Sequence, residues 1–182
     1  MTYEIDLAGL KRQLPICRVT DDLYIAAFVI FGDVELTEHC AKELLARAPE
    51  FDCLIAPEAK AIPLVYEMSR QSGKKYFVAR KRAKAYMKGI FEVNVRSITT
   101  DAEQKLIIDS DDAAALRGKR VLVVDDVIST GESMRAVEVL VEKAGGIVAG
   151  RAAPLAEGDS FYREDIIVLG QLPLFHPDGS VR

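Results

Sequence analysis

Short apolar runs alternate with longer amphipathic stretches along most of this chain, and this alternation constrains the fold more than any other feature. The short runs have the length and the Val, Ile and Leu content of buried strands, while the longer stretches repeat apolar residues at helical spacing. Strands that alternate with helices build a mostly parallel sheet with helices on its faces. The sequence therefore predicts an α/β fold with a mostly parallel central sheet flanked by helices. The expected strands are residues 53–56, 76–79, 120–124, 147–149 and 166–169, and the expected helices are residues 38–48, 62–72 and 132–144.

Cap residues mark several of these boundaries. Thr37 is placed to act as the N-cap of the first expected helix, because a threonine hydroxyl can accept a hydrogen bond from a free backbone amide of the first turn. Gly73 follows the second helix and is typical of a helix end. The tail 172–182 contains Pro173, Pro177 and Gly179, so we expect it to be irregular.

The chain has the size of one domain. It has 182 residues, of which 49% are hydrophobic, and this is enough for one buried core but short for two. We expect a single domain over residues 1–182 with its core at about 37–170. No apolar run approaches the roughly 20 residues that a membrane span needs, and the first ten residues carry Glu4 and Asp6 instead of a basic, apolar leader. We therefore expect a cytoplasmic protein without a membrane partner.

Cysteine, histidine and charge patterns narrow the possible partners. Cys17, Cys40 and Cys53 lack the close spacing of a metal or redox motif, and unpaired thiols fit a reducing compartment. His39 and His176 stand alone, so structural or surface roles are expected for both. The net charge of −4 argues against a general nucleic-acid binder, which must neutralise phosphates. Any site for a polyanion must therefore be local.

The segment 121–133, VLVVDDVISTGES, carries the strongest functional signal. An apolar strand leads into two acids and then into a short loop before a helix. Ligands bind at strand ends of open parallel sheets, and a helix N-terminus offers free amides and a positive dipole end. Asp125 and Asp126 would repel a phosphate held there, so they must face sugar hydroxyls or a metal ion. The residues expected to enclose the phosphate are Ser129, Thr130, Gly131, Glu132 and Ser133.

This segment resembles the signature loop of the type I phosphoribosyltransferases. The resemblance implies that Asp125 and Asp126 are the catalytic pair and contact the ribose hydroxyls of 5-phosphoribosyl-1-pyrophosphate (PRPP), directly or through Mg²⁺, while residues 129–133 hold its 5-phosphate. It also implies the fold of that family, with a small hood expected from about residues 1–36 and 171–182. A receiver domain also contains a strand such as RVLVVDDV, but it needs far more residues than follow Asp125. A purely structural alternative is that the two acids only cap a turn.

Residues 54–64 (LIAPEAKAIPL) and 77–86 (FVARKRAKAY) supply a second match to the same family. Negative charge accumulates on pyrophosphate as its bond to the sugar breaks, so fixed cations and a metal lower the barrier. A basic run alone more often indicates a solvated face or a nucleic-acid patch. Through the resemblance, the residues expected to bind pyrophosphate are Ala59, Lys60, Arg80, Lys81 and Lys84.

Residues 84–106 lose the regular pattern and predict a hairpin or a mobile flap. A closing flap would exclude water, which would otherwise hydrolyse the activated sugar. The stretch departs from the flap of the adenine enzymes. A catalytic acid or base is therefore left open, with Glu92 and Glu103 as guesses.

Taken together, these segments look most like the adenine phosphoribosyltransferases and their xanthine-using relatives. The resemblance implies transfer of 5-phosphoribosyl from PRPP to a purine base, adenine being expected, with release of pyrophosphate, Mg²⁺ as cofactor and a homodimer. Ser129 stands where hypoxanthine and guanine enzymes place an acid, and Tyr86 and Met87 replace the His and Gly of orotate enzymes. Xanthine or another base as acceptor remains an alternative. So does a PRPP-binding regulator without catalysis, although nothing before residue 37 has the length or basic charge of a winged helix.

Overall fold

The central sheet of the protein is parallel throughout. The computed structural model describes residues 1–96 and 103–182. Within them the sheet contains β4 (Cys53–Pro57), β5 (Tyr76–Ala79), β8 (Arg120–Val124), β9 (Val127–Ile128), β10 (Ile147–Glu157) and β11 (Ile167–Leu172). Their order is β11-β10-β8-β4-β5, with β9 paired to β10. Every pairing is parallel, so the predicted α/β fold with a mostly parallel sheet is confirmed.

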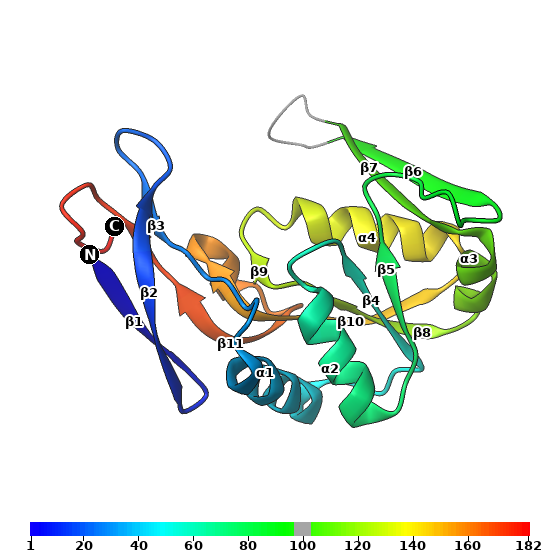
Figure 1. Ribbon diagram of the computed structural model, residues 1–182, viewed down its shortest axis with the longest axis horizontal. Coiled ribbons are helices and arrows are strands. Elements are labelled where there is room, and N and C mark those ends of the chain that lie inside the picture. Colours follow the sequence, from blue (N-terminus) through cyan, green and yellow to red (C-terminus); the bar gives the residue numbers. More distant parts are fainter. Residues whose placement is uncertain (97–102) are drawn as a thin grey trace.

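Helices cover both faces of this sheet (Figure 1). One face carries α1 (Val34–Arg47) and α2 (Ile62–Ser72), and the other carries α4 (Glu132–Lys143) and the short α3 (Ser110–Leu116). In strand β8, Val121–Val124 are all apolar because both faces of the strand are buried there. Leu122 and Val124 pack with the core that includes α1 and α2, whereas Val121 and Val123 pack with the core that includes α4. A parallel strand buried on both faces needs apolar residues throughout.

Helix α1 begins earlier than predicted, and the N-cap assigned to Thr37 is wrong. Asp33 is the N-cap, and its carboxylate accepts a hydrogen bond from the backbone amide of Leu36 at 3.0 Å. The Thr37 hydroxyl instead donates to the Asp33 carbonyl at 2.7 Å within the first turn. Arg12 pairs with the Asp33 carboxylate at 2.7 Å and fixes the cap. Helix α2 keeps its predicted bounds, and Gly73 is its C-cap with a left-handed backbone conformation.

Strand β10 is much longer than the expected strand 147–149. Residues 152–156 are fully buried, so they lack the alternation that marks a half-exposed strand, and Pro154 interrupts the sequence pattern. A register shift between Val148 and Gly150 separates the predicted start from the rest. Because of this extension, β10 runs to Glu157 beside β9 and β11.

The two ends of the chain share a second sheet. It consists of β1 (Thr2–Leu7), β2 (Leu10–Arg18), β3 (Tyr24–Ala26) and β12 (Leu174–Phe175), in that order and antiparallel. The tail is therefore partly regular, contrary to expectation, because β12 finds its partner in β3 far away in the sequence. Figure 1 shows this sheet at the side of the molecule where both termini lie, next to β11 and α1.

A hairpin lies on the face covered by α4. Strands β6 (Ile90–Arg96) and β7 (Glu103–Asp109) pair antiparallel, and a bridge between Arg80 and Ile107 ties β7 to the end of β5. The predicted hairpin is thus present, while positions 97–102 of the expected flap lie outside the described residues. Among the described residues, no helix is long and apolar enough to cross a membrane.

Candidate active site

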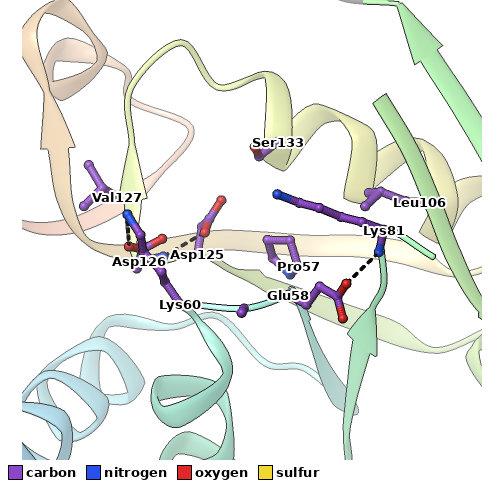
Figure 2. Close-up of a pocket in the computed structure, with 10 residues that line it drawn as sticks. Pro57, Glu58, Lys60, Lys81, Leu106, Asp125, Asp126, Val127 and Ser133 are labelled. Carbon is purple, nitrogen blue, oxygen red and sulfur yellow. Dashed lines mark hydrogen bonds and ion pairs between the residues drawn. The ribbon is translucent and has the colours of Figure 1, made fainter. Parts of the chain in front are cut away.

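The carboxyl ends of the parallel strands bring several of the predicted site residues together. A cavity of 240 Å³ opens at this edge between the loops after β4, β5 and β8. Figure 2 shows side chains from all three loops turned toward it. Its lining residues are Pro57, Glu58, Ala59, Lys60, Lys81, Leu106, Asp125, Asp126, Val127 and Ser133. Three acids and two lysines from separate parts of the chain therefore face one space.

Asp125 and Asp126 form a closely spaced acidic pair at the end of β8. Asp125 is only 7% exposed, and its carboxylate accepts a hydrogen bond from the backbone amide of Asp126 at 2.9 Å. Burial raises the pKa of Asp125 above its ordinary value, and the charge of the neighbouring Asp126 carboxylate raises it further. The Lys60 ammonium lies 3.9 Å from the Asp126 carboxylate and offsets part of that charge. Such a pair is poised to receive a cation or hydroxyl donors.

Residues 129–133 close into a small cup of 30 Å³ between β9 and α4. Gly131 is the N-cap of α4 and has a left-handed φ of 79°, a conformation that glycine adopts without strain. A Cβ at Gly131 would also lie 2.7 Å from Nη1 of Arg163. The cup therefore combines a helix N-terminus with a backbone that a side chain would obstruct, which suits an anion.

Glu58 organises the basic side of the larger cavity. Its carboxylate accepts hydrogen bonds from the Arg80 guanidinium at 3.2 Å and from the Lys81 backbone amide at 3.1 Å. Figure 2 shows the Lys81 side chain extending from this anchor toward Ser133. The peptide bond between Glu58 and Ala59 is cis. Lys81 is thus the basic residue of its segment that reaches the cavity.

Arg80 and Lys84 are not brought into the lining of this cavity, within the part of the chain that the structure describes. The Arg80 guanidinium lies over the Tyr86 ring, 5.8 Å from its centre. Glu92, one of the two candidates for a catalytic acid, pairs with Lys105 at 2.6 Å on the hairpin, away from the cavity lining. The side chain of Glu103, the other candidate, lies outside the described residues.

A second cavity of 270 Å³ lies between the antiparallel sheet and the central sheet. It shares Lys60, Asp126 and Val127 with the first cavity, so the two meet at the acidic pair. Its walls are mostly apolar. The lining residues are Ile25, Ala26, Ala27, Phe28, Val29, Lys60, Asp126, Val127, Ser129, Glu157 and Leu172. An apolar space with a few polar groups is typical of a site for a flat organic ligand.

Sequence reasoning missed several residues of these two cavities. Residues 25–29 and Leu172 carry no motif, and they come from opposite ends of the sequence, which meet where β12 pairs with β3. Glu157 follows the apolar run 152–156, but no motif surrounds it. Glu58 was also missed, although it lies next to Ala59 and Lys60, which the sequence did assign to the site.

The acidic pair alone does not make a closed metal centre. Among the described residues, no group of three or more His, Cys, Asp or Glu side chains is placed to hold a metal ion. Mg²⁺ commonly takes one or two carboxylates and completes its coordination with water and substrate oxygens. Asp125 and Asp126 fit that mode of binding, because both face the 240 Å³ cavity.

Comparison with known proteins places this site in a family. The profile of the phosphoribosyl transferase domain matches residues 35–169. The adenine phosphoribosyltransferase of Thermosipho africanus is 32% identical over 146 residues, which cover 79% of this chain and 83% of that protein. That of Thermotoga petrophila is 37% identical over 103 residues, and the match spans 58% of that relative's length and 57% of this chain.

Solved structures show the same fold. The crystal structure of adenine phosphoribosyltransferase from Thermoanaerobacter pseudethanolicus superposes with a TM-score of 0.65 at 24% identity, covering 94% of this chain and 95% of that one. The enzyme from Saccharomyces cerevisiae, crystallised with adenine and a bisphosphate ligand, has a TM-score of 0.64 at 17% identity over 92% of this chain and 93% of its own. The strands of the antiparallel sheet lie outside the residues that the family profile matches.

Proposed function

The chain belongs to the type I phosphoribosyltransferase family, and from that premise we propose that it transfers 5-phosphoribosyl from PRPP to a purine base, adenine being the acceptor, and releases pyrophosphate. The observation that carries this proposal is the arrangement of three spaces around one acidic pair. The anion cup, the cavity with Lys60 and Lys81, and the apolar cavity all share Val127.

Each space suits one part of the reactants. The cup at residues 129–133 would hold the 5-phosphate, Asp125 and Asp126 would hold the ribose hydroxyls, and the cavity with the lysines would hold pyrophosphate. The base would occupy the apolar cavity on the other side of Asp126. In this arrangement the leaving group and the attacking base lie on opposite sides of the sugar, as a displacement requires.

The chain's own residues would act by position and charge. Lys60 and Lys81 would stabilise the charge that grows on pyrophosphate as the bond from sugar C1 breaks. Asp126, held against Lys60, would fix the ribose ring while a ring nitrogen of the base attacks C1. No covalent enzyme intermediate is needed. Asp125 and Asp126 would hold Mg²⁺ together with PRPP oxygens, and the ion would supply further neutralisation of the pyrophosphate charge.

We also assign Arg80 and Lys84, which lie close to Lys81 in the sequence, to the pyrophosphate group, although neither lines the cavity in the described residues. The hairpin β6–β7 follows these residues in the chain, and we assign it the role of a flap over the reactants. The antiparallel sheet formed by the two ends of the chain would act as the hood over the base. The proposal further includes a single domain, a homodimer, a cytoplasmic location and a role in purine salvage.

The test is release of pyrophosphate from PRPP and Mg²⁺ in the presence of adenine, hypoxanthine, guanine and xanthine in turn. Adenine should give the highest kcat/KM. A higher value for another base would replace adenine as the acceptor. PRPP binding without turnover of any base would instead favour a regulator that binds the sugar as a signal.

A further inference from the structure

Glu157 stands out as a carboxyl group without a partner in the apolar cavity. It is the last residue of β10, where it pairs in register with Leu172 of β11, and both residues line the cavity. Its side chain is half-buried, and no hydrogen bond or ion pair joins it to another group in the described residues. A polar group that loses water on burial needs such a partner.

A structural role does not account for this side chain. Glu157 occupies the N-cap position of the 3-10 helix η1 (Gly158–Tyr162), yet its carboxylate accepts no capping hydrogen bond from that helix. The other charged groups of the cavity, Lys60 and Asp126, already pair with each other. Burial raises the pKa of Glu157, and no compensating interaction lowers it. The carboxylate is therefore left to interact with whatever fills the cavity.

We propose that Glu157 selects the base by accepting a hydrogen bond from its exocyclic amine, and this inference rests on the proposed function. A ligand in the 270 Å³ cavity contacts apolar walls from residues 25–29 and Leu172. Apolar walls select a ligand by its shape and do not distinguish its hydrogen-bond donors from its acceptors. Glu157 adds an acceptor at one point of that wall. An amine there satisfies the carboxylate, whereas the carbonyl of a 6-oxopurine places one acceptor against another.

The experiment compares adenine with unsubstituted purine, which lacks the amine, in the wild-type protein and in Glu157→Ala. The kcat/KM for adenine should fall roughly 10- to 100-fold in the variant, because a buried hydrogen bond to a charged group is lost. The value for purine should stay within about twofold, since purine never made that bond. The KM for PRPP should not change. Where purine reacts too slowly, its affinity in the presence of PRPP, measured by calorimetry, replaces turnover.

Glu157→Gln provides a second measurement that a merely structural role would not affect. Glutamine keeps one acceptor and adds an amide NH2 group that can donate to a 6-oxo group. The ratio of kcat/KM for hypoxanthine to that for adenine should therefore rise at least about tenfold. Glu164→Ala, which removes an exposed acid outside the cavities, serves as the matched control and should change neither ratio.

Two results separate the failure of this inference from that of the proposed function. If adenine and purine lose activity in parallel, or if neither variant changes the base preference, Glu157 does not read the amine. If the wild-type protein turns over no base at all, the proposed transferase activity is lost as well, whatever Glu157 does. If Glu157→Ala does not fold, the shift in preference of Glu157→Gln decides alone.

Discussion

The two cavities that meet at Asp126 are built in different ways. The one on the pyrophosphate side is lined by residues that directly follow β4, β5 and β8, and all of its strand-end loops lie within the matched family profile at residues 35–169. The one on the base side draws on residues 25–29 and Leu172, which lie outside that profile and come from opposite ends of the chain. The proposed chemistry of transfer is thus local in the sequence, whereas the proposed selection of the base depends on tertiary pairing.

This difference predicts two kinds of mutant. Changes on the pyrophosphate side should lower turnover with every base by the same factor, because all bases share PRPP. Changes on the base side should alter the preference among bases and leave the affinity for PRPP in place, as set out for Glu157.

Replacing both Asp125 and Asp126 by Asn should reduce kcat at least about a thousandfold with every base, because the sugar and the cation lose their charged ligands. Steady-state pyrophosphate release measures this, with circular dichroism to show that the fold is kept. Asp22→Asn, an exposed acid on the loop before β3, is the control. Equal turnover in the double variant would remove the acids from the mechanism.

Lys81→Ala should lower kcat/KM by roughly a hundredfold, since its ammonium reaches the cavity where leaving-group charge develops. Lys84→Ala should have a smaller effect, because Lys84 does not line that cavity in the described arrangement. Lys143→Ala, on the exposed last turn of α4, controls for loss of a lysine. An effect of Lys84→Ala as large as that of Lys81→Ala would contradict the assignment of Lys81 as the lysine of this segment that reaches the cavity.

Gly131→Ala should raise the KM for PRPP about tenfold while leaving base preference unchanged. The left-handed φ disfavours a side chain, and the new Cβ would lie 2.7 Å from Nη1 of Arg163, so that one of them must shift. Gly73→Ala is the matched control: its φ of 70° imposes similar strain, but nothing lies within 4 Å of its Cβ position and it is remote from the cup. A loss of stability of about 1 kcal/mol in both variants, with the KM raised only in Gly131→Ala, is the expected pattern.

The smallest effect concerns stability. Because burial raises the pKa of Asp125 in the folded state, the neutral acid favours folding below about pH 4, and this contribution is lost as the pH rises toward the folded-state value. Asp125→Asn should therefore melt at the same temperature as wild type near pH 4 and a few degrees higher near pH 8, without ligands. Thermal melts across that range measure the gap. A gap that shrinks with rising pH would show that the carboxylate stabilises the fold.

The sequence predicted those parts of the molecule in which local pattern and structure coincide. Strands β5 and β8 and helix α2 have their predicted bounds, because each pairs a clear apolar run or stripe with an unambiguous end. The extension of β10 was missed because a strand buried on both faces shows no alternation. Strand β12 was missed because two residues in a Pro-containing tail become a strand only when β3 pairs with them.

The site follows the same rule. Asp125, Asp126 and Ser133 could be named because their motif is contiguous, and the structure places them at one cavity. Glu157 could not be named, since its meaning depends on Leu172 and on residues 25–29 lying opposite it. A sequence motif indicates the binding residues that lie together on one loop. Binding residues that come from distant segments form no motif in a single sequence.

The pairing of β3 with β12 has a consequence for how the protein is made. During synthesis, β3 leaves the ribosome well before its partner Leu174–Phe175, which lies far later in the sequence. The parallel core and its anion cup can therefore assemble on a growing chain before the base-side wall exists. Nascent or clipped chains without β12 would retain the grip on the activated sugar but lose discrimination, a state in which water could compete with the intended acceptor.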